Sequence, residues 1–97
     1  MSLQEILQEK RQEILDLADQ HGALNVRVFG SVVRGEDTPD SDIDFLIDYD
    51  LQRTSSWFPA GLIVDLEELL GRKVDVVTEK GLHWYIRERV LAEAVSL

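Results

Sequence analysis

The sequence predicts a small α/β (α+β) domain with a short mixed sheet of about three strands flanked by about four helices. Three observations predict this class. Helix-like and strand-like patterns alternate along the chain, the 97 residues suffice for one domain, and 44% of them are hydrophobic, which is enough for a core. We therefore expect a single domain over residues 1–97.

The expected elements follow from hydrophobic periodicity and from start and stop signals. Ser2 and Glu5 have the spacing of a capping box, and Gly71 is a good residue just after a helix. Apolar positions recur at helical spacing in three segments and alternate in three others. In chain order we expect a helix over 3–21, a strand near 24–29, a helical turn at 32–34, a strand near 42–49, a helix from about 59 to 70, a strand at 73–78 and a helix over 83–94.

Two aspartates separated by one residue begin the second expected strand. Because alternate side chains of a strand point to the same face, Asp42 and Asp44 share one face. The apolar side chains share the other: Ile43, Phe45 and Ile47. Carboxylates about 7 Å apart repel each other unless a cation lies between them, and Mg²⁺ is commonly held by carboxylates together with phosphates. Taken alone, the pair is more typical of a solvated turn.

A Gly-Ser pair ends the first expected strand, with ten residues between it and Asp42. A strand that ends in this way and opens a helical turn presents free N–H groups to a phosphate. Gly30 permits close approach of the backbone, Ser31 adds a hydroxyl, and Arg34 adds a positive charge. The same pair also occurs in ordinary turns and N-caps. Neither Gly-x-Gly-x-x-Gly nor Gly-x-x-x-x-Gly-Lys-Ser/Thr is present.

A third aspartate, Asp75, interrupts the Val-rich third strand and points away from its valines. A buried or half-buried Asp needs a partner, which Arg72 or Lys73 would supply as a surface ion pair. If its strand instead adjoins the one that carries Asp42 and Asp44, three carboxylates converge beside a phosphate-binding turn. That is the composition of a two-metal phosphoryl-transfer site.

Together these motifs resemble the DNA polymerase β-type nucleotidyltransferase superfamily. Within it the short chain resembles the minimal nucleotidyltransferases, the MntA-like antitoxins of HEPN/MNT pairs, from about Leu24 to the end. Four segments carry the resemblance: Phe29-Gly30-Ser31, Asp40-Ser41-Asp42-Ile43-Asp44, Leu70 to Val77, and His83 to Val90. Arg34 matches the second Arg of the family's pattern, whereas many members carry Arg where this sequence has Val32.

The resemblance implies a small nucleotidyltransferase fold and AMP transfer from ATP to a hydroxyl, with a tyrosine of a HEPN-domain ribonuclease toxin as the acceptor. It implies catalytic and metal-binding roles for Asp42, Asp44 and Asp75 with two Mg²⁺ ions, or Mn²⁺, and phosphate binding by Gly30, Ser31 and Arg34. Asp75 is the expected acceptor of the hydroxyl proton. One alternative is a catalytically idle module that neutralises the toxin by occupancy. Transfer to a small molecule such as an aminoglycoside is weaker, since no residues remain for a second domain.

Composition restricts the partners. A formal net charge of −9 argues against stable nucleic-acid binding, because basic contacts supply most of that affinity. With no cysteine there is neither a disulfide nor a thiolate metal site. No signal pattern or long apolar run suggests a membrane, and we expect a cytoplasmic location.

Four aromatic residues begin predicted helices and are expected in the core or as hydrophobic staples: Trp57, Phe58, Trp84 and Tyr85. Stacking on a nucleotide base is the alternative for any of them. Trp57 and Trp84 are also candidates for a partner interface, where aromatics are enriched.

Overall fold

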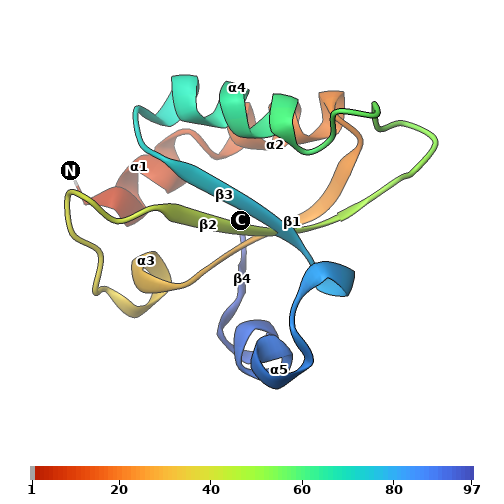
Figure 1. Ribbon diagram of the computed structural model, residues 1–97. Coiled ribbons are helices and arrows are strands. Elements are labelled where there is room, and N and C mark those ends of the chain that lie inside the picture. The colour runs from red at the N-terminus through yellow and green to blue at the C-terminus, as the bar shows by residue number, and fades with distance from the viewer. Residues whose placement is uncertain (1) are drawn as a thin grey trace.

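The computed structural model describes residues 2–97, which form a four-stranded sheet with helices on both sides (Figure 1). Its elements are α1 (Leu3–Glu9), α2 (Arg11–Gln20), β1 (Ala23–Phe29), α3 (Ser31–Arg34), β2 (Ile43–Tyr49), α4 (Ala60–Leu70), β3 (Val74–Thr78), a 3₁₀ turn (Glu79–Gly81), α5 (Trp84–Glu93) and β4 (Val95–Ser96). The predicted class, a small α+β fold with a mixed sheet, is confirmed. The sheet has one strand more than expected.

The N-terminal helical stretch begins as predicted but forms two helices instead of one. The Ser2 hydroxyl accepts a hydrogen bond from the Glu5 amide at 3.1 Å, which completes the capping box. At Lys10 the backbone turns (φ −98°, ψ 13°) and ends α1. The break lies where charged residues interrupt the apolar stripe, so a continuous helix would not keep one face against the core. At the end of α2, His21 Nε2 lies 2.7 Å from Asp65 Oδ2 of α4 and joins the two helices.

The sheet order is β3-β2-β1-β4, so β2 is flanked on both sides. It pairs antiparallel with β1 and parallel with β3, and α4 forms the crossover that a parallel pair requires. The parallel register places Asp44 opposite Asp75. This pairing decides where the acidic side chains of the two strands meet.

The core lies between the sheet and the layer formed by α1, α2 and α4, as Figure 1 shows. From β2, Ile43, Phe45 and Ile47 point into it and are at most 1% exposed. The central strand therefore buries its apolar face completely, as the alternating pattern predicted. The opposite face of the sheet is turned towards α3 and α5.

The C-terminal segment differs most from expectation. The predicted helix is present as α5, but the two residues of β4 that follow it pair antiparallel with β1. Only Val90 of α5 is buried. Trp57, Trp84 and Tyr85 are 80%, 84% and 67% exposed, so their expected core or staple role is wrong.

Partial burial is found for Phe58, which packs against the core and lies 5.5 Å from Tyr49 between ring centroids. Its neighbour Trp57 instead faces solvent.

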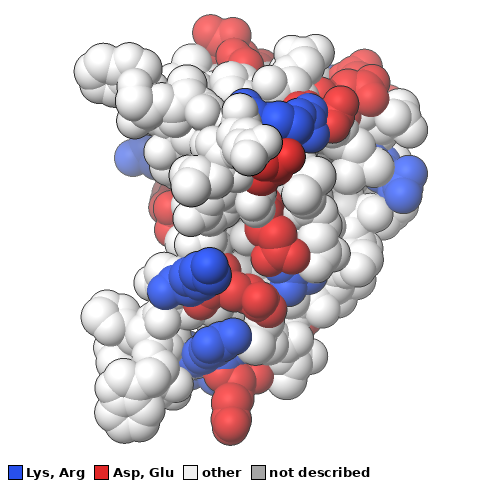
Figure 2. Space-filling view, turned by 90° about the vertical axis from the view of Figure 1, so that its right-hand side faces the viewer, with Lys and Arg blue, Asp and Glu red and all other residues white. Residues whose placement is uncertain are grey.

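Charged groups gather at the level of the sheet. Figure 2 shows Asp and Glu side chains, with Lys and Arg among them, over the hollowed region between the upper part of the molecule and α5. No helix within residues 2–97 is long and apolar enough to cross a membrane.

Candidate active site

The site begins at Gly30, where β1 ends and α3 starts. Gly30 has φ 84° and ψ −154°, a conformation that side chains with a Cβ rarely adopt. A Cβ at this position would also lie far inside van der Waals contact with Asp44 Oδ2. Two independent reasons therefore require glycine at position 30: the positive φ of its backbone and the close approach of the Asp44 carboxylate.

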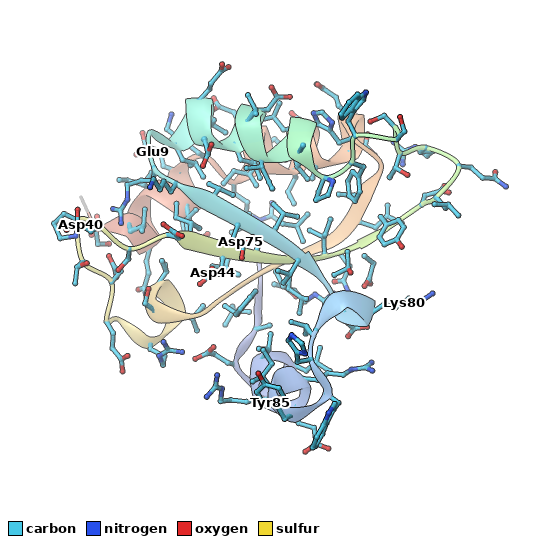
Figure 3. The ribbon with its side chains drawn as sticks, in the orientation of Figure 1. Glu9, Asp40, Asp44, Asp75, Lys80 and Tyr85 are labelled. Atoms are coloured by element: carbon cyan, nitrogen blue, oxygen red, sulfur yellow. The ribbon has the colours of Figure 1, made fainter. Side chains whose placement is uncertain are left out.

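The predicted convergence of Asp44 and Asp75 is present. The two residues are paired on adjacent strands, and Figure 3 shows their side chains next to each other on the face of the sheet turned towards α3 and α5. Asp44 is half-buried, whereas Asp75 is exposed. Asp75 therefore does not need the partner that a buried Asp would require, because β3 is an edge strand and leaves this position accessible. Within the described chain Asp75 forms no ion pair, and Arg72 instead donates to the Thr38 and Ser41 carbonyls at 2.8 Å.

Asp42 lies one residue before β2 and is exposed, so the predicted strand starts one residue later than expected. Its charge nevertheless acts on Asp44, since Asp42 is one of the groups that raise the pKa of that carboxyl. A cavity of about 300 Å³ adjoins Asp42 between the loop before β2 and the turn after α4. It is lined by Pro39, Asp40, Ser41, Asp42, Gly71, Arg72 and Lys73.

The electrostatics of the cluster centre on Asp44. Its pKa is raised from 3.8 to about 6, first by burial and then by the negative charges of Asp75 and Asp42, while the positive charge of Arg34 opposes the shift. Ionised Asp44 is thus destabilised by its own surroundings. A cation between these carboxylates would remove that cost.

The three aspartates fit a hard cation by chemistry, since oxygen ligands suit Mg²⁺ and Mn²⁺. Within residues 2–97, however, no three His, Cys, Asp or Glu side chains already converge as a metal-binding group. Asp42 and Asp75 are exposed and can rotate, whereas Asp44 is held beside Gly30. The residues therefore fit the ion after side-chain rotation of the two exposed members.

Arg34 and a residue that the sequence reasoning missed, Glu93, complete the site. The last residue of α5, Glu93, accepts a hydrogen bond from the Gly30 amide at 3.0 Å and another from Arg34 Nη1. Burial alone would raise the pKa of Glu93, but the hydrogen bonds from Arg34 and from the Gly30 amide lower it. A Glu at a helix end is usually solvated, so nothing in the local sequence indicated this contact.

The Val32 side chain does not face solvent at the turn after Gly30. Its side chain is 1% exposed and lies in the core, while its carbonyl accepts a hydrogen bond from the Gln4 side chain at 2.7 Å. An Arg at this position would have its charge buried in this backbone.

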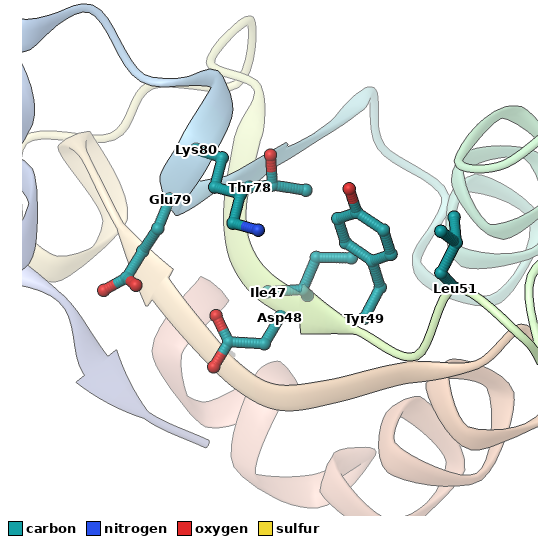
Figure 4. Close-up of a pocket in the computed structure, with 7 residues that line it drawn as sticks. All are labelled: Ile47, Asp48, Tyr49, Leu51, Thr78, Glu79 and Lys80. Atoms are coloured by element: carbon teal, nitrogen blue, oxygen red, sulfur yellow. The ribbon is translucent and has the colours of Figure 1, made fainter.

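A second cavity, of about 310 Å³, lies at the other end of β2 and β3 (Figure 4). It is lined by Ile47, Asp48, Tyr49, Leu51, Thr78, Glu79 and Lys80. None of the predicted site residues is among them, so this cavity is separate from the aspartate cluster.

Comparison with known proteins shows the family to which the chain belongs. A family model described as "Nucleotidyltransferase domain" matches residues 5–97, nearly the whole chain. The chain belongs to the nucleotidyltransferase domain family, and the predicted enzyme class is thereby confirmed.

Sequence relatives include proteins named as protein adenylyltransferases, MntA among them. A Methanocaldococcus jannaschii protein named "putative protein adenylyltransferase" is 34% identical over 91 residues, which cover 94% of this chain and 97% of that protein. The protein adenylyltransferase MntA of Thermococcus cleftensis is 40% identical over 80 residues, covering 82% of this chain and 80% of MntA. The predicted similarity to minimal nucleotidyltransferases is confirmed.

Two solved structures are also similar to this chain. One described as a "putative minimal nucleotidyltransferase" is 46% identical, has a TM-score of 0.85 and covers 100% of this chain and 97% of its own. A toxin–antitoxin structure with AMP-PNP is 20% identical and has a TM-score of 0.72, covering 88% of this chain and 69% of that one. The second likeness shows a shared fold.

Replacing Gly30 by Ala is expected to destabilise the protein by more than the same change at Gly35. Gly35 also has a positive φ, 72°, but a Cβ at that position would have no other atom within 4 Å, so Gly35→Ala should cost only about 1 kcal/mol of backbone strain. Gly30→Ala adds the clash with Asp44. Urea unfolding of both variants measures the difference, and equal losses of stability would contradict the close approach.

Asp44→Asn should stabilise the metal-free protein at pH 8. Because the pKa of Asp44 is higher folded (about 6) than unfolded (near 3.8), the folded state binds more protons between these values. Its stability therefore falls as pH rises through that window and stays lower above it. After allowance for solvent screening at this half-exposed site, the variant should gain about 1 kcal/mol at pH 8 and nothing below pH 4.

Urea unfolding of Asp44→Asn and the parent in the presence of a chelator, at pH 8 and below pH 4, tests this prediction. Asp48→Asn is the matched control on the same strand and should lose stability, since Asp48 accepts from Arg27 Nη2 at 3.2 Å. An Asp44→Asn variant that is less stable than the parent at pH 8 would contradict the electrostatic account.

Proposed function

We propose that this protein transfers AMP from ATP to a hydroxyl group, the side chain of a tyrosine, on a partner HEPN ribonuclease toxin, and so acts as its antitoxin. The observation that carries the proposal is the pairing of Asp44 with Asp75 beside the Gly30 turn. Carboxylates next to a turn that opens a helix suit a metal-bound triphosphate better than any other common ligand.

The proposed roles divide between the turn and the strands. Ser31 at the start of α3 would donate its hydroxyl and amide to the outer phosphates, with Arg34 as an additional donor. Asp42, Asp44 and Asp75 would hold the ions. When bound, Mg²⁺ would supply charge neutralisation for the triphosphate and the leaving pyrophosphate. Asp75, which is exposed on the edge strand, would accept the proton of the incoming hydroxyl.

A protein acceptor fits the shape of the site. The face that carries Asp44 and Asp75 opens to solvent at the edge strand β3, so a side chain on a second protein can reach it. The relatives named protein adenylyltransferases support the donor nucleotide and a protein acceptor. The toxin–antitoxin structure with AMP-PNP, which shares this fold, supports a toxin as partner. The cytoplasm, where ATP is available, is the proposed location.

Divalent metal should stabilise the folded protein through the aspartate cluster. Mn²⁺ or Mg²⁺ at a hundredfold excess over its dissociation constant should add about 2.7 kcal/mol, since binding to the folded state alone shifts unfolding. Thermal melts of Asp42→Asn/Asp44→Asn should show no metal-induced shift. The control Glu13→Gln/Asp16→Asn removes the same charge from α2 on the far side of the sheet and should keep it. Equal shifts in all three proteins would contradict the three-carboxylate site.

Asp44→Asn should abolish AMP transfer while leaving the complex with the partner intact. The carboxylate is needed for chemistry, but an exposed interface does not need it. Intact-mass measurement of the partner detects the added AMP, and co-purification detects the complex; Asp48→Asn is the control. If Asp44→Asn neutralises the toxin in cells as well as the parent does, the protein acts by occupancy and the catalytic proposal is wrong.

A further inference from the structure

The C-terminal helix reaches the phosphate-binding turn through one side chain. Glu93 is the last residue of α5, its side chain is only 16% exposed, and its carboxylate accepts hydrogen bonds from the Gly30 amide and from Arg34 Nη1. These two donors belong to the segment that the proposed function assigns to the nucleotide phosphates. α5 otherwise buries only Val90, so this is its main polar link to the site.

Strand pairing fixes the place of Glu93. In the antiparallel β1–β4 pair, Val28 lies opposite Val95, and Arg27 opposite Ser96. Gly30 follows Val28 by two residues and Glu93 precedes Val95 by two, so the pairing brings the end of α5 to the turn, where Glu93 accepts the hydrogen bond from Gly30. The short strand β4 therefore aligns Glu93 with the turn.

Arg34 is held by two carboxylates. Its Nε donates to Glu36 at 3.0 Å and its Nη1 to Glu93, while Nη2 has no hydrogen-bond partner among the residues that the structure describes. The Glu36 side chain is 65% exposed, and exposed ion pairs hold a side chain weakly. Glu93 is thus the firmer of the two contacts and leaves one guanidinium nitrogen available to a ligand.

We infer that Glu93 is a positioning residue of the nucleotide site, which fixes the turn at Gly30 and sets the Arg34 guanidinium for the triphosphate from the C-terminal helix. This inference rests on the proposed function. A flexible Arg that must be ordered by its ligand costs affinity, and a carboxylate that orders it beforehand removes that cost. The negative charge of Glu93 also contributes to the raised pKa of Asp44, but Arg34 offsets much of that charge at contact distance.

The rival role is competition. A carboxylate on these donors could instead occupy the place of a phosphate, and its removal would then tighten nucleotide binding. The two roles predict opposite signs, so one titration separates them.

The experiment measures binding of a non-hydrolysable ATP analogue with Mg²⁺ by calorimetry. We expect Glu93→Ala to weaken binding about tenfold and Glu93→Gln about threefold, since Gln keeps a carbonyl oxygen for one of the two donors. Glu88→Gln is the control, because Glu88 is an exposed residue of the same helix and loses the same charge. In the background Arg34→Ala, the effect of Glu93→Gln should shrink, since much of it acts through Arg34.

An NMR measurement reports the positioning without nucleotide. Hydrogen exchange of the Gly30 amide should become faster in Glu93→Ala and stay near the parent rate in Glu88→Gln. Tighter binding of the analogue by either Glu93 variant would overturn the inference, as would unchanged affinity with lower thermal stability, the result of a purely structural contact. The isosteric Gln variant keeps the test valid if Glu93→Ala does not fold.

The outcomes also separate this inference from the proposed function. A parent protein that binds no nucleotide would overturn both. A parent that binds the analogue while Glu93→Ala binds it equally well would overturn only the role of Glu93.

Discussion

The site depends on the complete burial of one face of β2. Ile43, Phe45 and Ile47 are at most 1% exposed beneath the helical layer, and this fixes the register of the strand, because a slip by one residue would bury Asp44 and expose all three. The charged residues of the strand must then lie on the opposite face. The chemistry of that face is thus a consequence of how the hydrophobic core is built.

The parallel partner strand adds the second charge. Since β3 runs beside β2 with Asp75 paired to Asp44, like charges meet across the strands and raise the pKa of Asp44 to about 6 together with burial. Gly30 brings the turn between β1 and α3 against the same carboxylate, and Glu93 holds that turn from α5. The protein therefore keeps unfavourable charges together, an arrangement typical of sites that function with a cation.

Local sequence patterns predicted the elements whose signals are local. The alternation on β2, the αL glycine at Gly71 and the helical turn after Gly30 follow from short-range rules. The two-residue strand β4 is too short for any periodicity, and Glu93 reaches its partners only through the pairing of β4 with β1. The outward direction of Trp84 depends on how little of α5 is covered. The strand β4, the Glu93 contacts and the exposure of Trp84 all depend on contacts between distant parts of the chain, which local sequence patterns do not record.

The most direct test of the account locates the metal and nucleotide on the surface. In ¹H–¹⁵N spectra, a trace of Mn²⁺ with ATP should broaden the amide signals of residues 30–31, 42–44 and 75, because a paramagnetic ion affects nearby nuclei most strongly. Amides of α1 and α2 should broaden least, and those of the cavity formed by residues 47–51 and 78–80 should broaden less than those of the aspartate cluster. Broadening centred on that cavity, or spread evenly over the acidic surface, would contradict a cation site formed by the paired aspartates beside Gly30.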